Sequence, residues 1–118
     1  MSEEIIDLKN ALERVQDDQK LLDELFDIFK EDFVQRRRAL GEAITARDIT
    51  KIKEIVHSIK GSASHISAGR LYAACLKLEA LAKEGKTDGM QEVVSRIDGY
   101  FEEVKVFSAR FKKGLGVR

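Results

Sequence analysis

The sequence predicts an all-α protein, an antiparallel up-down four-helix bundle with an additional short helix at its N-terminus. Its 118 residues contain no proline and are rich in strong helix formers. Apolar residues recur every three or four positions along nearly the whole chain. No stretch shows the alternation of apolar and polar residues that marks a strand. The length fits a single domain over 1–118, with the short helix within 1–16 and a flexible glycine-containing tail at 114–118.

The first helix is predicted over 5–15, where apolar residues step by three and four. Asp17 or Asp18 then suits the N-cap of a second helix over 19–46. Three consecutive arginines interrupt the apolar stripe of this helix. We therefore expect either a bend near residues 33–38 or long arginine stems that cover the edge of the core.

The third and fourth helices are predicted over 50–65 and 68–84, each with a regular apolar face. Asp48 precedes the third helix and Ser67 the fourth, and both residue types favour the N-cap position. Gly85 follows the fourth helix, where a glycine commonly ends a helix in a left-handed conformation.

The fifth helix is predicted over 89–112, with an apolar stripe that ends in phenylalanines. Asp88 stands at its start and Gln91 follows three residues later, the spacing of a capping box. Short turns between the long helices favour antiparallel neighbours.

Composition excludes several classes of protein. The net charge is zero, with 21 basic and 21 acidic residues, whereas a duplex-binding domain normally carries a large basic excess. The single cysteine, Cys75, cannot form an internal disulfide, and it lies on an apolar stripe that predicts a buried, inert thiol. The acidic N-terminus is unlike a signal peptide, and no apolar run reaches the ~20 residues of a membrane span. We therefore expect a cytoplasmic protein with no nucleic-acid or membrane partner.

Charge is unevenly distributed along the chain. Residues 1–32 hold 4 basic and 11 acidic residues, whereas residues 33–70 hold 8 basic and 3 acidic ones. The basic middle segment could face an acidic partner or a phosphate. Charge alone favours the simpler interpretation, which is solvated helix faces.

The two histidines, His57 and His65, are the candidate chemical groups. Eight residues apart on one helix, they lie ~12 Å apart and cannot share a metal ion. No cluster of cysteines or carboxylates completes a metal site, and no glycine-rich loop could bind ATP phosphates. On a helical wheel centred on Ile59, His57 falls at about 160° and projects away from the core. Without further evidence it could equally be an idle surface histidine.

Two neighbours of His57 point to chemistry. Gly61 lies one turn along the same helix, where glycine costs ~1 kcal/mol relative to alanine and clears space beside the ring. Lys60 lies close enough to neutralise an anion held on the imidazole. Imidazole is largely neutral and nucleophilic near pH 7, because its reference pKa is ~6.5. His57, Lys60 and Gly61 together predict a phosphoryl acceptor site.

The stretch HSIKGSASHISAGRLYAACLKLE at 57–79 resembles the signature of histidine-containing phosphotransfer (HPt) domains. The resemblance rests on the following residues: His57, Ile59, Lys60, Gly61, Ser62, Leu71, Leu78 and Glu79. The upstream run ALERVQDDQKLLDELFDIFKEDF at 11–33 looks like the N-terminal helices of the same family. One position departs, since Ser67 stands where the family commonly has glycine. We expect the turn to survive because serine can cap the following helix.

The resemblance implies a four-helix bundle that accepts a phosphoryl group on His57 from the aspartyl phosphate of a response-regulator receiver and passes it to another receiver. Such a protein is a phosphocarrier in two-component signalling rather than an enzyme, and it has no ATP site of its own. It binds no cofactor, and the receiver supplies carboxylates and Mg²⁺. The expected partners are receiver domains or a hybrid sensor histidine kinase, and the chain is expected to be a monomer.

The docking surface for the partner should be apolar around the histidine. We expect Phe29, Phe33 and Val34 to contribute to it, together with Ser64, which falls at about 140° on the wheel, close to His57. The alternative for the phenylalanines is an ordinary place in the core.

Two rival functions remain open from the sequence. One is a helical bundle that only binds other proteins, in which His57 is idle. The other is the phosphoacceptor domain of a chemotaxis-type kinase, which a separate ATP-binding domain phosphorylates. The nature of the phosphoryl donor distinguishes the second rival from a phosphorelay carrier.

Overall fold

The computed structural model describes residues 4–115 and contains five α-helices and no strand within them. The helices are α1 (Leu8–Arg14), α2 (Gln19–Thr45), α3 (Ile49–His65), α4 (Gly69–Lys83) and α5 (Met90–Gly114). The all-helical prediction, with four long helices and a short N-terminal one, is confirmed, and every helix end lies within three residues of its predicted position. The outermost parts of the predicted N-terminal piece and of the tail, residues 1–3 and 116–118, lie outside the described residues.

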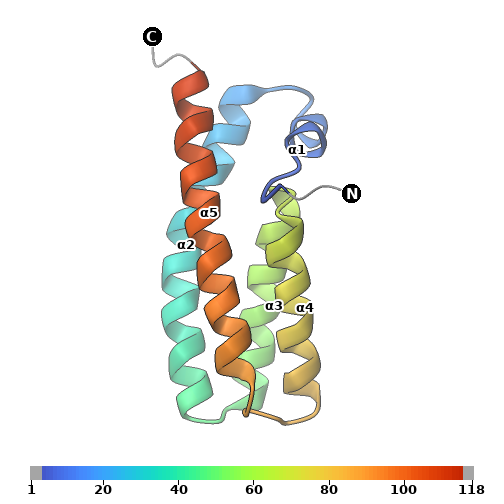
Figure 1. Cartoon of the computed structure of the whole chain (residues 1–118), viewed down its shortest axis with the longest axis vertical. Helices are drawn as coiled ribbons and strands as arrows, with labels where there is room; N and C mark the ends of the chain where they lie inside the picture. The colour runs from blue at the N-terminus through green and yellow to red at the C-terminus, as the bar shows by residue number, and fades with distance from the viewer. Residues whose placement is uncertain (1–3, 116–118) are drawn as a thin grey trace.

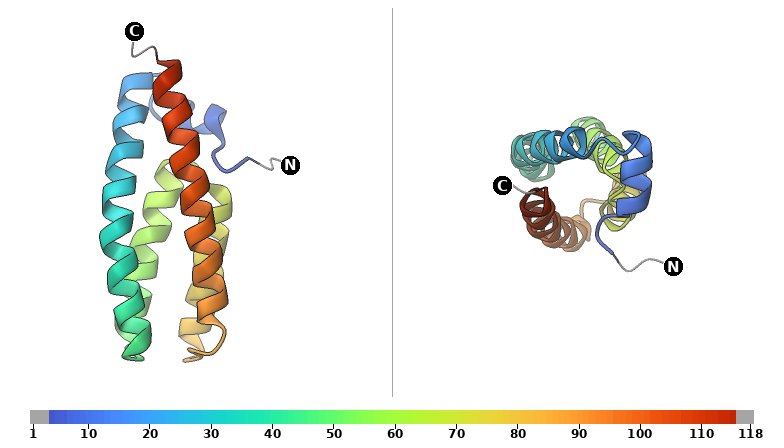
Figure 2. Two further views of the ribbon diagram at one scale, coloured as in Figure 1. Left: turned by 60° about the vertical axis from the view of Figure 1, so that its left-hand side comes forward. Right: turned by 90° about the horizontal axis from the view of Figure 1, so that it is seen from above.

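The four long helices lie side by side in an elongated bundle of 48 × 28 × 21 Å. Successive long helices run in opposite directions, and α1 lies beside the upper ends of α3 and α4 (Figure 1). Figure 2 shows that α2 and α5 extend beyond the α3–α4 pair at the end where α1 lies. A single apolar core runs through the bundle, so each long helix has one buried face and one outer face.

Three of the helices begin at an aspartate: Asp18 and Asp48 are caps that the sequence predicts, whereas Asp7 lies within the predicted first helix. The carboxylates of Asp7, Asp18 and Asp48 each accept a hydrogen bond from the backbone N–H three residues later. The end of α4 is also as predicted, because Gly85 adopts a left-handed φ of 68°. Its N–H donates to the carbonyl of Ala82, and the next N–H donates to Leu81, which is the Schellman arrangement.

Two predicted caps are wrong. The N-cap of α4 is Ala68 rather than Ser67, and the N-cap of α5 is Gly89 rather than Asp88. Neither of these helices has a side-chain cap. Gly89 has a φ of 89°, a conformation that glycine adopts at little cost, so the turn geometry at α5 decides against the aspartate.

The turn between α3 and α4 survives without the family's glycine, for a reason other than capping. Ser67 itself adopts a left-handed φ of 58°. Its carbonyl accepts a hydrogen bond from the N–H of Asp7 at 3.0 Å, and its hydroxyl donates to Oδ1 of Asn10 at 2.7 Å. The turn is therefore bound to the N-terminal segment, which offsets the conformational strain at Ser67.

This arrangement predicts opposite roles for the conformation and the hydroxyl of Ser67. Ser67→Ala loses the hydrogen bond to Asn10 and keeps the strained φ, whereas Ser67→Gly loses the bond and relieves the strain. We expect Ser67→Gly to be more stable than Ser67→Ala by about 1 kcal/mol, the usual penalty of a left-handed non-glycine residue. Denaturant unfolding of the two variants measures the difference. Equal stabilities would show that the turn relaxes to another conformation.

The arginines of α2 do not interrupt the helix, which is continuous through residues 33–38. Arg36 donates to the hydroxyl of Ser62 on α3 at 2.9 Å. Arg37 forms a two-pronged ion pair with Asp98 on α5, at 2.7 and 3.1 Å. Both side chains are partly buried, so their stems lie along the edge of the core, and the two neighbours connect α2 to α3 on one side and to α5 on the other.

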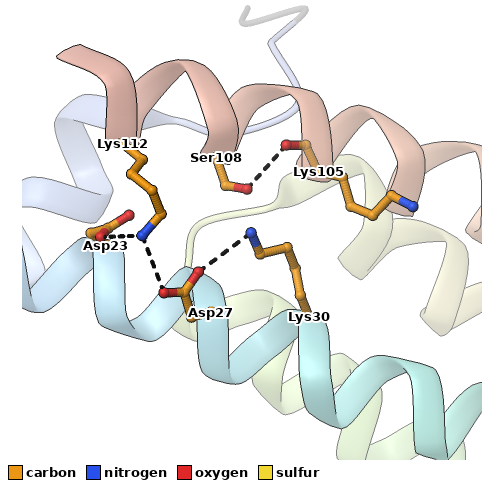
Figure 3. A network of polar contacts seen from close by, with 6 residues as sticks. All are labelled: Asp23, Asp27, Lys30, Lys105, Ser108 and Lys112. Carbon is orange, nitrogen blue, oxygen red and sulfur yellow. Dashed lines mark hydrogen bonds and ion pairs between the residues drawn. The ribbon is translucent and has the colours of Figure 1, made fainter. Parts of the chain in front are cut away.

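A second polar cluster connects the first turns of α2 to the last turns of α5 (Figure 3). The ammonium of Lys112 donates to Asp23 at 2.8 Å and to Asp27 at 3.3 Å. The hydrogen bond that Lys112 donates to Asp23, together with the one that it donates to Asp27, raises the pKa of Lys112. Within residues 4–115, no helix is both long and apolar enough to span a bilayer.

Candidate functional site

His57 lies on the outer face of α3, and 75% of its side chain is exposed. The prediction that its ring projects away from the core is therefore confirmed. Its Nδ1 atom lies 3.7 Å from Oε2 of Glu79, which comes from the neighbouring helix α4. The Nδ1 edge of the ring thus faces a carboxylate of the same molecule.

Lys60 lies beside His57, as the sequence predicted, but its ammonium is already paired. Its Nζ donates to Oε1 of Glu79 at 2.9 Å, and both side chains are about four-fifths buried. That hydrogen bond raises the pKa of Lys60, so the lysine remains protonated at any physiological pH. Glu79 therefore bridges the histidine and the lysine through its two carboxylate oxygens.

The role of Glu79 is the main feature that the sequence alone did not reveal. In the sequence it is only one of the residues on which the family resemblance rests. Its two contacts depend on the pairing of α3 with α4 at this level, and a helical wheel of α3 contains no information about that pairing.

Gly61 faces open space. A Cβ atom placed on it would have no other group within 4 Å beyond its own helix. No neighbouring helix packs against its Cα, so a close-packing explanation for this glycine fails. The outer surface of α3 is consequently unobstructed one turn from the imidazole.

The predicted docking role of Phe29 and Phe33 is wrong. Both side chains are only 3% exposed. Each contacts the ring of Phe101 on α5, and Phe33 stacks on it with a centroid distance of 4.0 Å. The alternative interpretation, an ordinary place in the core, is the correct one.

Val34 is 53% exposed, but it does not lie on the side of His57. It is three residues from Arg37, which pairs with α5, and two residues from Arg36, which bonds to α3. Residues three apart share a helix face and residues two apart do not, so Val34 lies toward α5.

The apolar residues near the site come from α4 instead. Tyr72 and Leu76 are 36% and 44% exposed. They share a helix face with Glu79, because Leu76 lies four residues after Tyr72 and three residues before Glu79. Ser64 is half-buried and lines a cleft of about 460 Å³ together with Tyr72 and Arg14. The sequence does contain a signal for this exposed apolar surface, because Tyr72 and Leu76 are large apolar residues outside the buried stripe of their helix.

The other candidate groups take no part in this arrangement. Cys75 is buried, and burial raises the pKa of its thiol to about 12, which agrees with the predicted inert thiol. His65 is exposed at the last residue of α3. Among residues 4–115, no group of three or more histidine, cysteine or acidic side chains could hold a metal ion.

An exposed histidine with an open glycine one turn away matches the pattern of the family that the motif resembles. Comparison with known families decides whether the chain belongs to that family. The model of the Hpt domain matches residues 24–106, which include His57, Lys60, Gly61 and Glu79. The chain belongs to the Hpt domain family. Histidine phosphotransfer in two-component phosphorelays is therefore the role of this domain, and a phosphotransfer domain of this kind generally has no ATP site of its own.

A solved structure supports the fold of this Hpt domain. The crystal structure of histidine-containing phosphotransfer protein B (HptB) from Pseudomonas aeruginosa PAO1 matches with a TM-score of 0.87 and 23% sequence identity. The match covers 95% of this chain and 97% of HptB, so it extends beyond the residues of the family match to most of the chain. Among curated protein sequences, none matches this Hpt domain at a significant level.

Proposed function

We propose that this Hpt domain carries a phosphoryl group on His57, which it accepts from the aspartyl phosphate of one receiver domain and donates to the aspartate of another. The observation that carries the proposal is an exposed imidazole whose Nδ1 edge faces Glu79. This leaves Nε2 as the outward nucleophile, and Gly61 leaves the approach to it clear. We further propose that the chain works as a cytoplasmic monomer.

The transfer of the phosphoryl group to His57 requires no group that accepts a proton. The lone pair of Nε2 attacks phosphorus, the P–O bond to the receiver carboxylate breaks, and the carboxylate remains on the receiver. The proton on Nδ1 stays in place, where Glu79 stabilises the positive charge that the ring acquires. The reverse sequence returns the phosphoryl group to a second receiver.

Lys60 contributes charge rather than a bond. Its ammonium donates a hydrogen bond to Glu79, which holds the ammonium beside the ring and keeps it protonated. A phosphoryl group on His57 brings negative charge to this position, and Lys60 can share its ammonium with it. By the family resemblance, Mg²⁺ and the carboxylates that bind it belong to the receiver, and this chain holds no cofactor.

Lys60→Ala should slow transfer without abolishing it. The nucleophile remains, but one cation near the transferred group is lost, so we expect a rate about tenfold to a hundredfold lower, at or below the effect of removing one preorganised donor. Single-turnover labelling from a phosphorylated receiver measures the rate. Lys77→Ala on α4 is a suitable control, because Lys77 is exposed in a groove beside α5. A rate equal to that of the parent would remove Lys60 from the mechanism.

The proposal is tested by comparing phosphoryl donors. The chain is incubated separately with receiver domains phosphorylated on aspartate and with a histidine kinase catalytic domain plus ATP. We expect rapid labelling from at least one receiver and return of the label to a second receiver. Labelling by the kinase alone would indicate the chemotaxis-type phosphoacceptor, and binding of receivers without labelling would indicate a bundle that only binds proteins.

A further inference from the structure

Along the seam between α3 and α4, the surface beside His57 is apolar in one half and basic in the other. The turn that follows His65 joins the two helices at one end of this seam. Between that turn and Glu79 lie Tyr72 and Leu76, the exposed apolar residues of α4. This half of the seam therefore presents an apolar surface next to the phosphoacceptor.

The other half of the seam is basic. Lys53 lies four residues before His57 on α3, and Lys83 lies four residues after Glu79 on α4. Because His57 contacts Glu79 and each lysine lies one turn farther from the α3–α4 turn, both lysines lie on the same side of that contact. Both are exposed, and neither side-chain ammonium has a hydrogen-bond or ion-pair partner among residues 4–115.

These two lysines differ from the other cations near the site. Lys60 is paired with Glu79, and Arg36 bonds to Ser62. Around the axis of α3, the exposed acid Glu54 falls on the other side of His57 from Lys60. The positive charge that remains available to a partner is therefore concentrated on the α4 side of the ring.

We propose that this seam orients the receiver domain, with Lys53 and Lys83 contacting an acidic surface and Leu76 and Tyr72 contacting an apolar one. The inference rests on the proposed function, because it describes how the partner of that site is held. Unpaired lysines on a rim increase the association rate with an acidic partner, and the apolar half contributes affinity. Since the two halves differ, only one orientation satisfies both, and that orientation fixes the line of approach to Nε2.

The test uses two double variants with the same change in charge on the same two helices. Lys53→Glu with Lys83→Glu reverses the charge of the seam. Lys51→Glu with Lys77→Glu is the control, because both lysines are exposed and lie on other faces. Lys51 is two residues from Lys53, and Lys77 lines the groove between α4 and α5. The receiver used is the one that labels the parent fastest.

We expect the seam variant to raise KM for the phosphorylated receiver roughly tenfold to a hundredfold at low salt, with kcat near the parent value. The effect should shrink at about 0.5 M salt, where exposed charges are screened. The control variant should stay within about twofold of the parent. Labelling of His57 by phosphoramidate, a small donor that needs no docking surface, should be unchanged in both variants.

Equal losses in the two double variants would overturn the inference, because net charge alone would then explain them. A fall in kcat with an unchanged KM, or loss of labelling by phosphoramidate, would also overturn it, because the lysines would then act on the ring. A parent chain that phosphoramidate labels but no receiver labels would contradict the proposed function itself. That outcome is distinguishable, because it appears before any variant is made.

Discussion

Replacing His57 by glutamine is expected to reduce receiver-dependent labelling to background while leaving the fold intact. Glutamine has a similar reach, but its amide nitrogen has no lone pair available to attack phosphorus. The side chain is 75% exposed, so its replacement should change the free energy of unfolding by no more than about 0.5 kcal/mol. Thermal melts of parent and variant, run beside the labelling assay, separate loss of chemistry from loss of structure.

The second histidine provides the matched control for this experiment. His65 lies on the same helix and is also exposed, so His65→Gln changes an equivalent side chain eight residues away. The labelling of the His65→Gln variant should equal that of the parent. The label should be lost in acid and stable in alkali, as expected for phosphohistidine. Persistent label on His57→Gln protein, or its loss from His65→Gln protein, would assign the phosphoryl group to another residue.

The fold could be predicted from the sequence because its determinants are local. The apolar spacing defines all four long helices, and two of the three predicted aspartate caps, Asp18 and Asp48, begin their helices as expected. The failures occurred at Ser67 and Asp88, where the φ of a turn residue decides which residue is the cap. Such angles depend on how the two flanking helices meet, and residue preferences at one position do not specify them.

The candidate site was predictable to the extent that it lies on one helix. His57, Lys60 and Gly61 are all on α3, and a helical wheel places them correctly relative to the core. Glu79 and Leu76 belong to α4, and their position beside His57 depends on the register between two helices. The docking role of Phe33 failed for the same reason, since its stacking on Phe101 is a contact between α2 and α5.

Glycine alone is a weak signal of function in this chain. Gly99 also lies within a long helix, and a Cβ atom on it would likewise meet nothing within 4 Å. Gly61 differs only in its position, one turn from an exposed histidine. The glycine becomes informative because of its neighbour, and Gly99 becomes the natural control for it.

Gly61→Ala and Gly61→Gln should therefore raise stability and lower transfer at the same time. Either side chain favours the helix, by up to ~1 kcal/mol for alanine, and neither meets a neighbouring group that must move. We expect alanine to slow transfer from the receiver severalfold. Glutamine should slow it at least about a hundredfold, because it displaces the partner from the in-line position that phosphoryl transfer requires.

The matched variants Gly99→Ala and Gly99→Gln isolate the effect of position. They should give a similar gain in melting temperature, and their transfer rates should equal that of the parent, because α5 does not carry the site. Phosphoramidate should label all four variants, since a small donor needs less clearance than a receiver domain. A Gly61→Gln protein that accepts the phosphoryl group from a receiver at the parent rate would show that the partner approaches His57 from another side. A lower melting temperature for Gly61→Ala would show that the helix needs this glycine for its own packing.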